Sequence, residues 1–154
     1  MKNIDFKKLF FYVGITVFIG SLPSFFIKIS DTYKSLKKPP FSPPGFLFPI
    51  VWTILFILMG ISIYRIMQSK SDNKKDARLL YFIQLIINAC WTPIFFGFNQ
   101  YFLAFLWILM LILLVVVMIL MFFKIDKVSA YLNIPYLIWL LFACYLNFGV
   151  YILN

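Results

Sequence analysis

The stretch KKPPFSPPGFLFPIVWTILFILMGIS (Lys37–Ser62) places four prolines between a basic pair and a long apolar run. Consecutive prolines hold a chain near the polyproline II conformation and lack backbone donors, so this part cannot join the helix that follows. The apolar run is long enough to cross a bilayer, which takes about 20 residues. The stretch therefore predicts a stiff, non-helical segment at the mouth of a membrane-spanning helix.

The whole chain has the composition of an integral membrane protein. Of its 154 residues, 64% are hydrophobic and 12% are charged, whereas soluble domains carry about 25% charged residues. The apolar runs lack the period-two alternation of a lipid-facing β-barrel, which leaves helices. We expect an all-α membrane protein with one domain (residues 1–154), a compact bundle of five transmembrane helices at approximately residues 9–27, 46–67, 79–98, 101–123 and 128–153. The first run could instead be a secretory signal, but its length favours a retained helix.

Basic residues flank the expected spans unequally. The net charge is +9, and no single basic patch forms, so we expect no nucleic-acid partner. Ten basic residues fall on the side of the N-terminus and four on the side of the first loop, which predicts a cytoplasmic N-terminus and an external C-terminus. We expect a multi-pass protein of a bacterial cell membrane. The ten are Lys2, Lys7, Lys8, Arg65, Lys70, Lys74, Lys75, Arg78, Lys124 and Lys127, and the four are Lys28, Lys34, Lys37 and Lys38.

The first connection is much longer than the others. It runs from Lys28 to Gly45 and contains aromatic residues that can anchor it. Loops of this length are usually functional or disordered, and the prolines favour an ordered lid over a solvated linker. Ser42 followed by Pro43 predicts an N-cap with proline at the first helical position. Asp126 is a candidate cap for the fifth helix.

Three expected helices carry aromatic residues at helical spacing. The third helix places the amides of Gln84 and Asn88 at mid-membrane depth, where hydrocarbon cannot satisfy them, so that stripe must face the bundle interior. Such stripes arise either from helix packing or from a ligand pocket, and the residues leave both open. Trp107 does not belong to such a stripe, and we expect it to serve helix packing. The stripes are Trp52, Phe56, Met59 and Ile63; Gln84, Asn88, Trp91 and Phe95; and Pro135, Trp139, Phe142 and Leu146.

The chain offers little catalytic chemistry. It has no histidine, which excludes imidazole ligands for haem or zinc, and we expect no metal site and no required cofactor. All five acidic residues lie outside the expected spans, so the proton-relay acid of an ion-coupled transporter is missing. Cys90 and Cys144 lie inside spans, where thiols usually behave as small hydrophobes, and no disulfide is expected.

Three segments resemble the TspO/MBR family, which includes translocator proteins and tryptophan-rich sensory proteins. They are Lys38–Ser62, Gln84–Phe96 and Ser129–Asn154, with the proline signature ahead of VW, the Q-L-x-x-N-x-x-W stretch and P-Y-x-x-W. The resemblance implies a five-helix bundle, usually a homodimer, with a ligand cavity beneath the first loop. It also implies hydrophobic small-molecule ligands: protoporphyrin IX or a haem-related tetrapyrrole, sterols, and isoquinoline carboxamide or benzodiazepine drugs.

The resemblance also implies which residues would bind such ligands. From the first loop these are Tyr33, Pro43, Pro44 and Gly45, and from the helices they are Trp52, Phe56, Asn88, Trp91, Phe95, Trp139 and Ala143. The helical stripe adds Phe142 and Leu146. The chain departs from the family in having Phe41 where tryptophan is frequent, and in lacking a basic residue after Tyr145 and Tyr151, which puts sterol binding through the C-terminal motif in doubt.

Three functions are compatible with these features. The first is a membrane receptor in which tryptophans stack on a tetrapyrrole, Asn88 orients it and loop lysines meet its propionates. The second is light-dependent porphyrin degradation with Trp52 and Trp139 as the reactive residues, which the resemblance implies for some bacterial relatives. The third is transport of tetrapyrrole or lipid, which the missing intramembrane charge disfavours.

Overall fold

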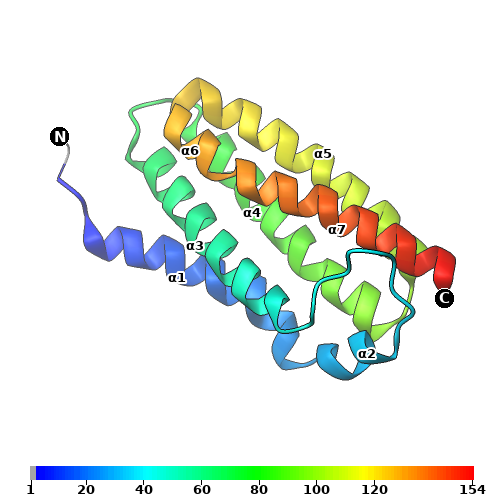
Figure 1. Ribbon diagram of the computed structural model, residues 1–154. Coiled ribbons are helices and arrows are strands. Elements are labelled where there is room, and N and C mark those ends of the chain that lie inside the picture. Colours follow the sequence, from blue (N-terminus) through cyan, green and yellow to red (C-terminus); the bar gives the residue numbers. More distant parts are fainter. Residues whose placement is uncertain (1–2) are drawn as a thin grey trace.

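The computed structural model describes residues 3–154 as a bundle of helices (Figure 1). No strand occurs in this described range. Five segments are long and apolar enough to cross a membrane, which confirms the prediction of an all-α membrane bundle: Phe6–Phe25, Leu47–Gln68, Lys74–Gly97, Tyr101–Ile125 and Lys127–Leu153.

Three of these spans depart from regular α-helix at or next to a proline. The first span is α1 (Phe6–Ser21) followed by a 3₁₀ turn, η1 (Leu22–Phe25), that contains Pro23. The third is α4 (Lys74–Thr92) followed by a π-helical turn, η2 (Pro93–Gly97). The last is divided at Asn133, just before Pro135, because a proline cannot donate the backbone bond that continues a helix. The remaining helices are α2 (Ile29–Ser35), α3 (Leu47–Gln68), α5 (Tyr101–Ile125), α6 (Lys127–Leu132) and α7 (Ile134–Leu153).

The first loop covers one end of the bundle, which we call the loop end. Figure 1 shows residues 28–46, with the short α2, passing from the end of α1 beside the C-terminal part of α7 to the start of α3. The Tyr145 hydroxyl donates to the Pro40 carbonyl oxygen at 2.9 Å, and the Asn154 amide exchanges two hydrogen bonds with the Lys37 backbone. The loop is therefore ordered and docked on α7.

The predicted cap at Ser42 is wrong. Helix α3 begins four residues after Pro43, with Phe46 at its N-cap, and the Ser42 hydroxyl instead donates to the Pro39 carbonyl oxygen. The chain makes a turn at Phe41, whose φ of 63° lies in the left-handed region. This local turn satisfies the serine and carries the chain across the bundle before the helix starts.

Close contact between α1 and α3 depends on Gly60. A Cβ atom at Gly60 would lie 2.5 Å from the Cα atom of Val13, whereas one at Gly14 would meet nothing within 4 Å. Small residues of this kind let membrane helices approach. Most of the remaining core lies between α3, α4, α5 and the α6–α7 span.

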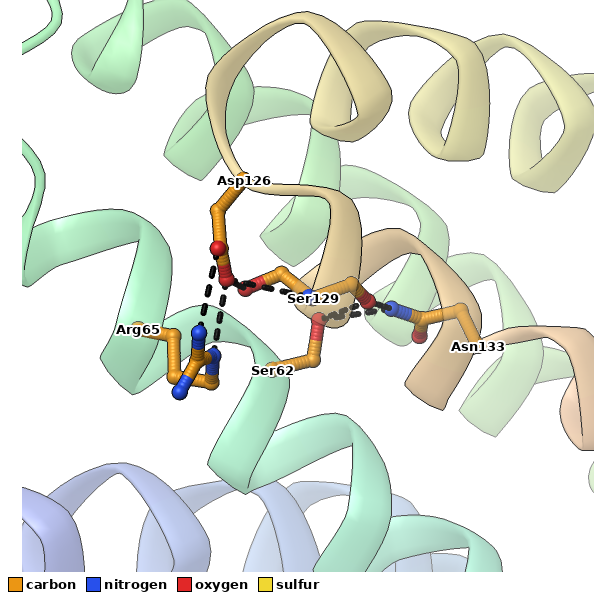
Figure 2. A network of polar contacts seen from close by, with 5 residues as sticks. All are labelled: Ser62, Arg65, Asp126, Ser129 and Asn133. Carbon is orange, nitrogen blue, oxygen red and sulfur yellow. Dashed lines mark hydrogen bonds and ion pairs between the residues drawn. The ribbon is translucent and has the colours of Figure 1, made fainter.

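A polar network fastens α6 to the C-terminal half of α3 at the end opposite the loop, which we call the basic end (Figure 2). Arg65 binds the Asp126 carboxylate through Nε at 2.7 Å and Nη2 at 3.1 Å. Asp126 also accepts from the Ser129 backbone N–H, which confirms it as the cap. Deeper in the bundle, Ser62 donates to the Ser129 carbonyl oxygen and accepts from Asn133. The network positions the start of the last span.

Candidate functional site

Rings from α3, α7 and the first loop meet beneath the loop. Phe48 lies between the loop and α7, with its ring centroid 5.2 Å from that of Tyr33 and 5.9 Å from that of Trp139. Trp52, one turn further along α3, stacks on Phe56 at 5.3 Å and lies 6.2 Å from Tyr136. We call these rings, together with Phe142, the aromatic cluster.

The aromatic cluster stays partly accessible. Phe48, Trp52, Trp139 and Phe142 are all half-buried, although their helices are almost wholly apolar. Trp52 of α3 contacts Tyr136 of α7, and Trp139 of α7 contacts Phe48 of α3, so each tryptophan lies against a ring of the other helix. A planar hydrophobic molecule could therefore contact both tryptophans from the side where α3 and α7 meet.

Trp91 belongs to a different group of rings. Its indole Nε1 donates to the Asn147 amide oxygen at 3.0 Å, and its ring stacks on Phe95 at 4.8 Å. Phe95 is buried with Leu36 of the first loop, Ala104 and Val150. Trp91 thus ties α4 to α7, and its ring contacts within the described chain run to Phe95 and Phe96 rather than to Trp52 or Trp139.

The mid-membrane amides face the interior, as expected. Gln84 is fully buried, and Asn88 is 7% exposed. Asn88 donates to the Tyr136 hydroxyl at 2.7 Å, and that hydroxyl donates to the Gln84 side-chain oxygen at 2.9 Å. In this structure Asn88 is paired with Tyr136 of α7, whose ring lies 6.2 Å from that of Trp52.

Three buried polar side-chain atoms have no hydrogen-bond partner within residues 3–154: Trp139 Nε1, Gln84 Nε2 and Asn133 Oδ1. Buried donors and acceptors are nearly always paired, because leaving one unpaired costs about 1–3 kcal/mol. Trp139 is the one that belongs to the aromatic cluster. By contrast, the indole of Trp107 donates to the Ile87 carbonyl oxygen at 2.8 Å, in keeping with its expected packing role.

The loop residues of the site form a compact corner. The Tyr33 hydroxyl donates to the Pro43 carbonyl oxygen at 2.5 Å, and the Pro44 carbonyl oxygen accepts from the first residue of α3. Burial raises the pKa of Tyr33, which keeps the phenol protonated as a donor. A Cβ atom at Gly45 would lie 3.4 Å from the Tyr33 ring. Tyr33 therefore packs directly against the corner that precedes α3.

Lys38 is exposed, but its side chain is fixed on the backbone of this corner. Its ammonium donates to the Tyr33 carbonyl oxygen at 2.9 Å and lies 4.8 Å from the Tyr33 ring centroid. All four lysines of the first loop are exposed, but Lys28, Lys34 and Lys37 make no such contact with the loop within residues 3–154. Those three are the loop cations that remain open to an anionic ligand.

The inner face of α7 is displaced from the predicted stripe. Pro135 is exposed, Phe142 and Ala143 are half-buried and Leu146 is 8% exposed. The deepest positions are Tyr136, Leu140 and Asn147, which are at most 1% exposed. Sequence reasoning did not identify Phe48 and Tyr136 as members of the aromatic cluster, or Asn147 as the partner of Trp91. The polar atoms of Tyr136 and Asn147, which need partners in an apolar helix, were the signal that could have found them.

Cavities also occur away from the aromatic cluster. One of about 360 Å³ lies between the start of α4 and the end of α5, and one of about 200 Å³ lies between α1 and the end of α3. Both are at the basic end. At the loop end, the rings of the aromatic cluster pack against each other, so a ligand would enter by separating ring–ring contacts.

Comparison with known proteins gives a consistent result. Residues 12–153 match the model of the TspO/MBR family. The chain is 36% identical over 146 residues to the tryptophan-rich protein TspO of Chlorobaculum tepidum, covering 92% of each chain. It is 40% identical to protein CrtK of Rhodobacter capsulatus over 79% of this chain and 78% of the relative, and 34% identical to the translocator protein of Ovis aries over 77% and 72%. The chain therefore belongs to the TspO/MBR family of multi-pass membrane proteins.

Proposed function

We propose that this protein is a membrane receptor that binds porphyrins such as protoporphyrin IX, and related hydrophobic ligands, at the aromatic cluster. The observation that supports it most is the buried Trp139 Nε1, which has no acceptor within the described residues. A carboxylate, a carbonyl or an unprotonated ring nitrogen of a bound porphyrin would accept this hydrogen bond, and the neighbouring rings would stack on its faces.

The proposed ligand lies with its ring between α3 and α7 and its acidic groups toward the loop end. Trp52 and Trp139 contact the ring, and the exposed loop lysines meet its propionates. Because Phe48 now fills the space between Tyr33 and Trp139, binding displaces its ring. Isoquinoline carboxamide or benzodiazepine drugs and sterols are smaller apolar rings that would use the same contacts.

A titration with matched tryptophan variants tests the proposal. Protoporphyrin IX is added to the purified protein, and the quenching of tryptophan fluorescence is followed. We expect saturable quenching, with Kd weakened about ten-fold in Trp139→Phe because a hydrogen bond to a charged group contributes about 1.5–3 kcal/mol. Trp107→Phe, whose indole is already paired, should keep the wild-type Kd within about two-fold. Linear, non-saturable quenching, or equal weakening in both variants, would reject the proposal.

We also infer that the basic end faces the cytoplasm of a bacterial cell and that the protein forms homodimers. The orientation is supported by the surplus of Lys and Arg at that end, and the dimer by the family resemblance. An impermeant maleimide should label Asn154→Cys but not Lys127→Cys in intact cells, in a background without Cys90 and Cys144. The reverse labelling would overturn the orientation, and a monomer mass by light scattering would overturn the dimer.

A further inference from the structure

A cavity at the basic end has the shape and chemistry of a lipid site. It measures about 360 Å³ and lies between the first turn of α4 and the last turns of α5, at the end of the bundle opposite the aromatic cluster. Its lining is divided between polar groups at the surface and apolar groups below. The residues that matter here are Asn73, Asp76 and Lys124 at the rim and Val117, Leu120 and Met121 on the floor.

The floor of this cavity is open to the bilayer. Val117 is 51% exposed and Leu120 is 57% exposed, and both lie in the apolar part of a candidate membrane span. They are one turn apart on α5, so together they form an apolar track that leads from the rim toward the membrane interior. A track of this kind fits an acyl chain.

The cation at the rim is available. Lys124 is exposed in the last turn of α5, and its ammonium forms no ion pair or hydrogen bond with any other residue in the range 3–154. The smaller cavity at the same end differs in this respect, because its Lys8 is paired with Asp5 at 3.2 Å. A lysine directly above an apolar track can bind a phosphate while the acyl chain lies on the track.

We propose that this cavity binds one anionic phospholipid, with its phosphate at Lys124 and one acyl chain along Val117 and Leu120. The lysines at the start of α4 make the surroundings positive, which favours an anionic headgroup over a zwitterionic one. Asp76 and Asn73 add oxygen acceptors beside Lys124. Hydroxyl groups can donate to these oxygens, so the glycerol headgroup of phosphatidylglycerol suits the rim.

Native mass spectrometry of the purified full chain tests this site. The protein is released from detergent containing phosphatidylglycerol or phosphatidylcholine with the same acyl chains, and the bound lipids are counted. Wild type should retain phosphatidylglycerol in preference to phosphatidylcholine. Lys124→Gln should reduce retention of the first bound phosphatidylglycerol about five-fold, the effect of one lysine near a membrane surface. Leu120→Trp, which fills the track, should reduce retention of both lipids.

Lys127→Gln is the matched control. It removes the same charge at a position three residues further along the chain. The Lys127 side chain is exposed and does not line the cavity. We expect it to leave retention of the first phosphatidylglycerol within about two-fold of wild type, because that lipid is held by the cavity. Equal retention of the two lipids by wild type, an unchanged Lys124→Gln, or equal losses in Lys124→Gln and Lys127→Gln would overturn the proposal.

Discussion

The hydroxyl of Tyr145 on α7 donates to the carbonyl oxygen of Pro40 in the first loop at 2.9 Å, across 105 residues of sequence. Tyr145 also stacks on Phe142, whose ring lies 5.5 Å from that of Trp139. The same turn of α7 thus holds the loop and supports the aromatic cluster, so loosening the loop should affect the site beneath it.

Tyr145→Phe should therefore loosen the first loop without unfolding the bundle. Removing one hydrogen bond near the surface should raise the fraction of open loop about two- to five-fold. Limited trypsin digestion after Lys34 and Lys37 measures this directly. Tyr151→Phe is the matched control, because Tyr151 lies on the same helix and its hydroxyl has no partner among residues 3–154. Equal digestion rates for Tyr145→Phe and wild type would contradict the hydrogen bond.

Substituting Gly60 should weaken the contact between α1 and α3. The new Cβ atom would meet the Val13 backbone, which cannot move aside, and overpacking of this kind costs about 1–3 kcal/mol. Gly14→Ala should be neutral or stabilising by up to about 1 kcal/mol, because nothing lies near that position and alanine favours helix. Unfolding in detergent with increasing SDS compares the two. If both substitutions shift the midpoint equally, the close approach is not present.

Arg65→Gln should change the acid stability of the protein. The hydrogen bond from Arg65 is the main cause that lowers the pKa of Asp126 from 3.8 to about 2, with help from Ser129 and against the effect of burial. A carboxylate with a lowered folded-state pKa stabilises the protein above its ordinary pKa, and this stability is lost as the pH falls toward 2. The stability difference between wild type and Arg65→Gln should therefore be full above about pH 5 and shrink as the pH falls to 2.

Thermal unfolding in detergent at a series of pH values measures this difference. Asp126→Ala, which also removes the cap of α6, should cost about 1–3 kcal/mol at neutral pH. A stability difference between wild type and Arg65→Gln that is the same at pH 7 and pH 2 would show that the ion pair does not hold the charged form of Asp126.

The alternative of light-dependent porphyrin breakdown makes its own prediction. If a tryptophan of the aromatic cluster donates an electron to the excited porphyrin, Trp52→Phe and Trp139→Phe should slow the loss of porphyrin absorption under illumination by about ten-fold or more. Trp107→Phe should decay at the wild-type rate. Wild-type decay in both cluster variants, measured with the porphyrin bound, would exclude this reaction and leave binding alone.

Sequence patterns were sufficient for the membrane class and for the inward direction of α4. Gln84 and Asn88 could only be satisfied inside the bundle, and the structure pairs both with Tyr136. The cap by Asp126 followed from its position directly before a helix, because such capping is local. These predictions succeeded because each depended on one residue and its immediate surroundings.

The predictions that failed depended on contacts between distant segments. Ser42 had the residue type of a cap, but the docking of the loop on α7 moved the start of α3 to Leu47. On α7 the sequence did not single out Asn147, because its partners on α4 and α5 lie far away in the chain. Spacing along one helix does not specify which neighbour will satisfy a polar group.

The indole N–H of Trp139 is the most direct test of the receptor proposal. In the ¹⁵N-labelled protein, the four tryptophans give four indole N–H signals in a two-dimensional NMR spectrum. Adding protoporphyrin IX should shift the Trp139 signal strongly, because that N–H gains an acceptor, while the signal of Trp107, already bound to Ile87, stays in place. An unmoved Trp139 signal at saturating porphyrin would contradict ligand binding at the aromatic cluster.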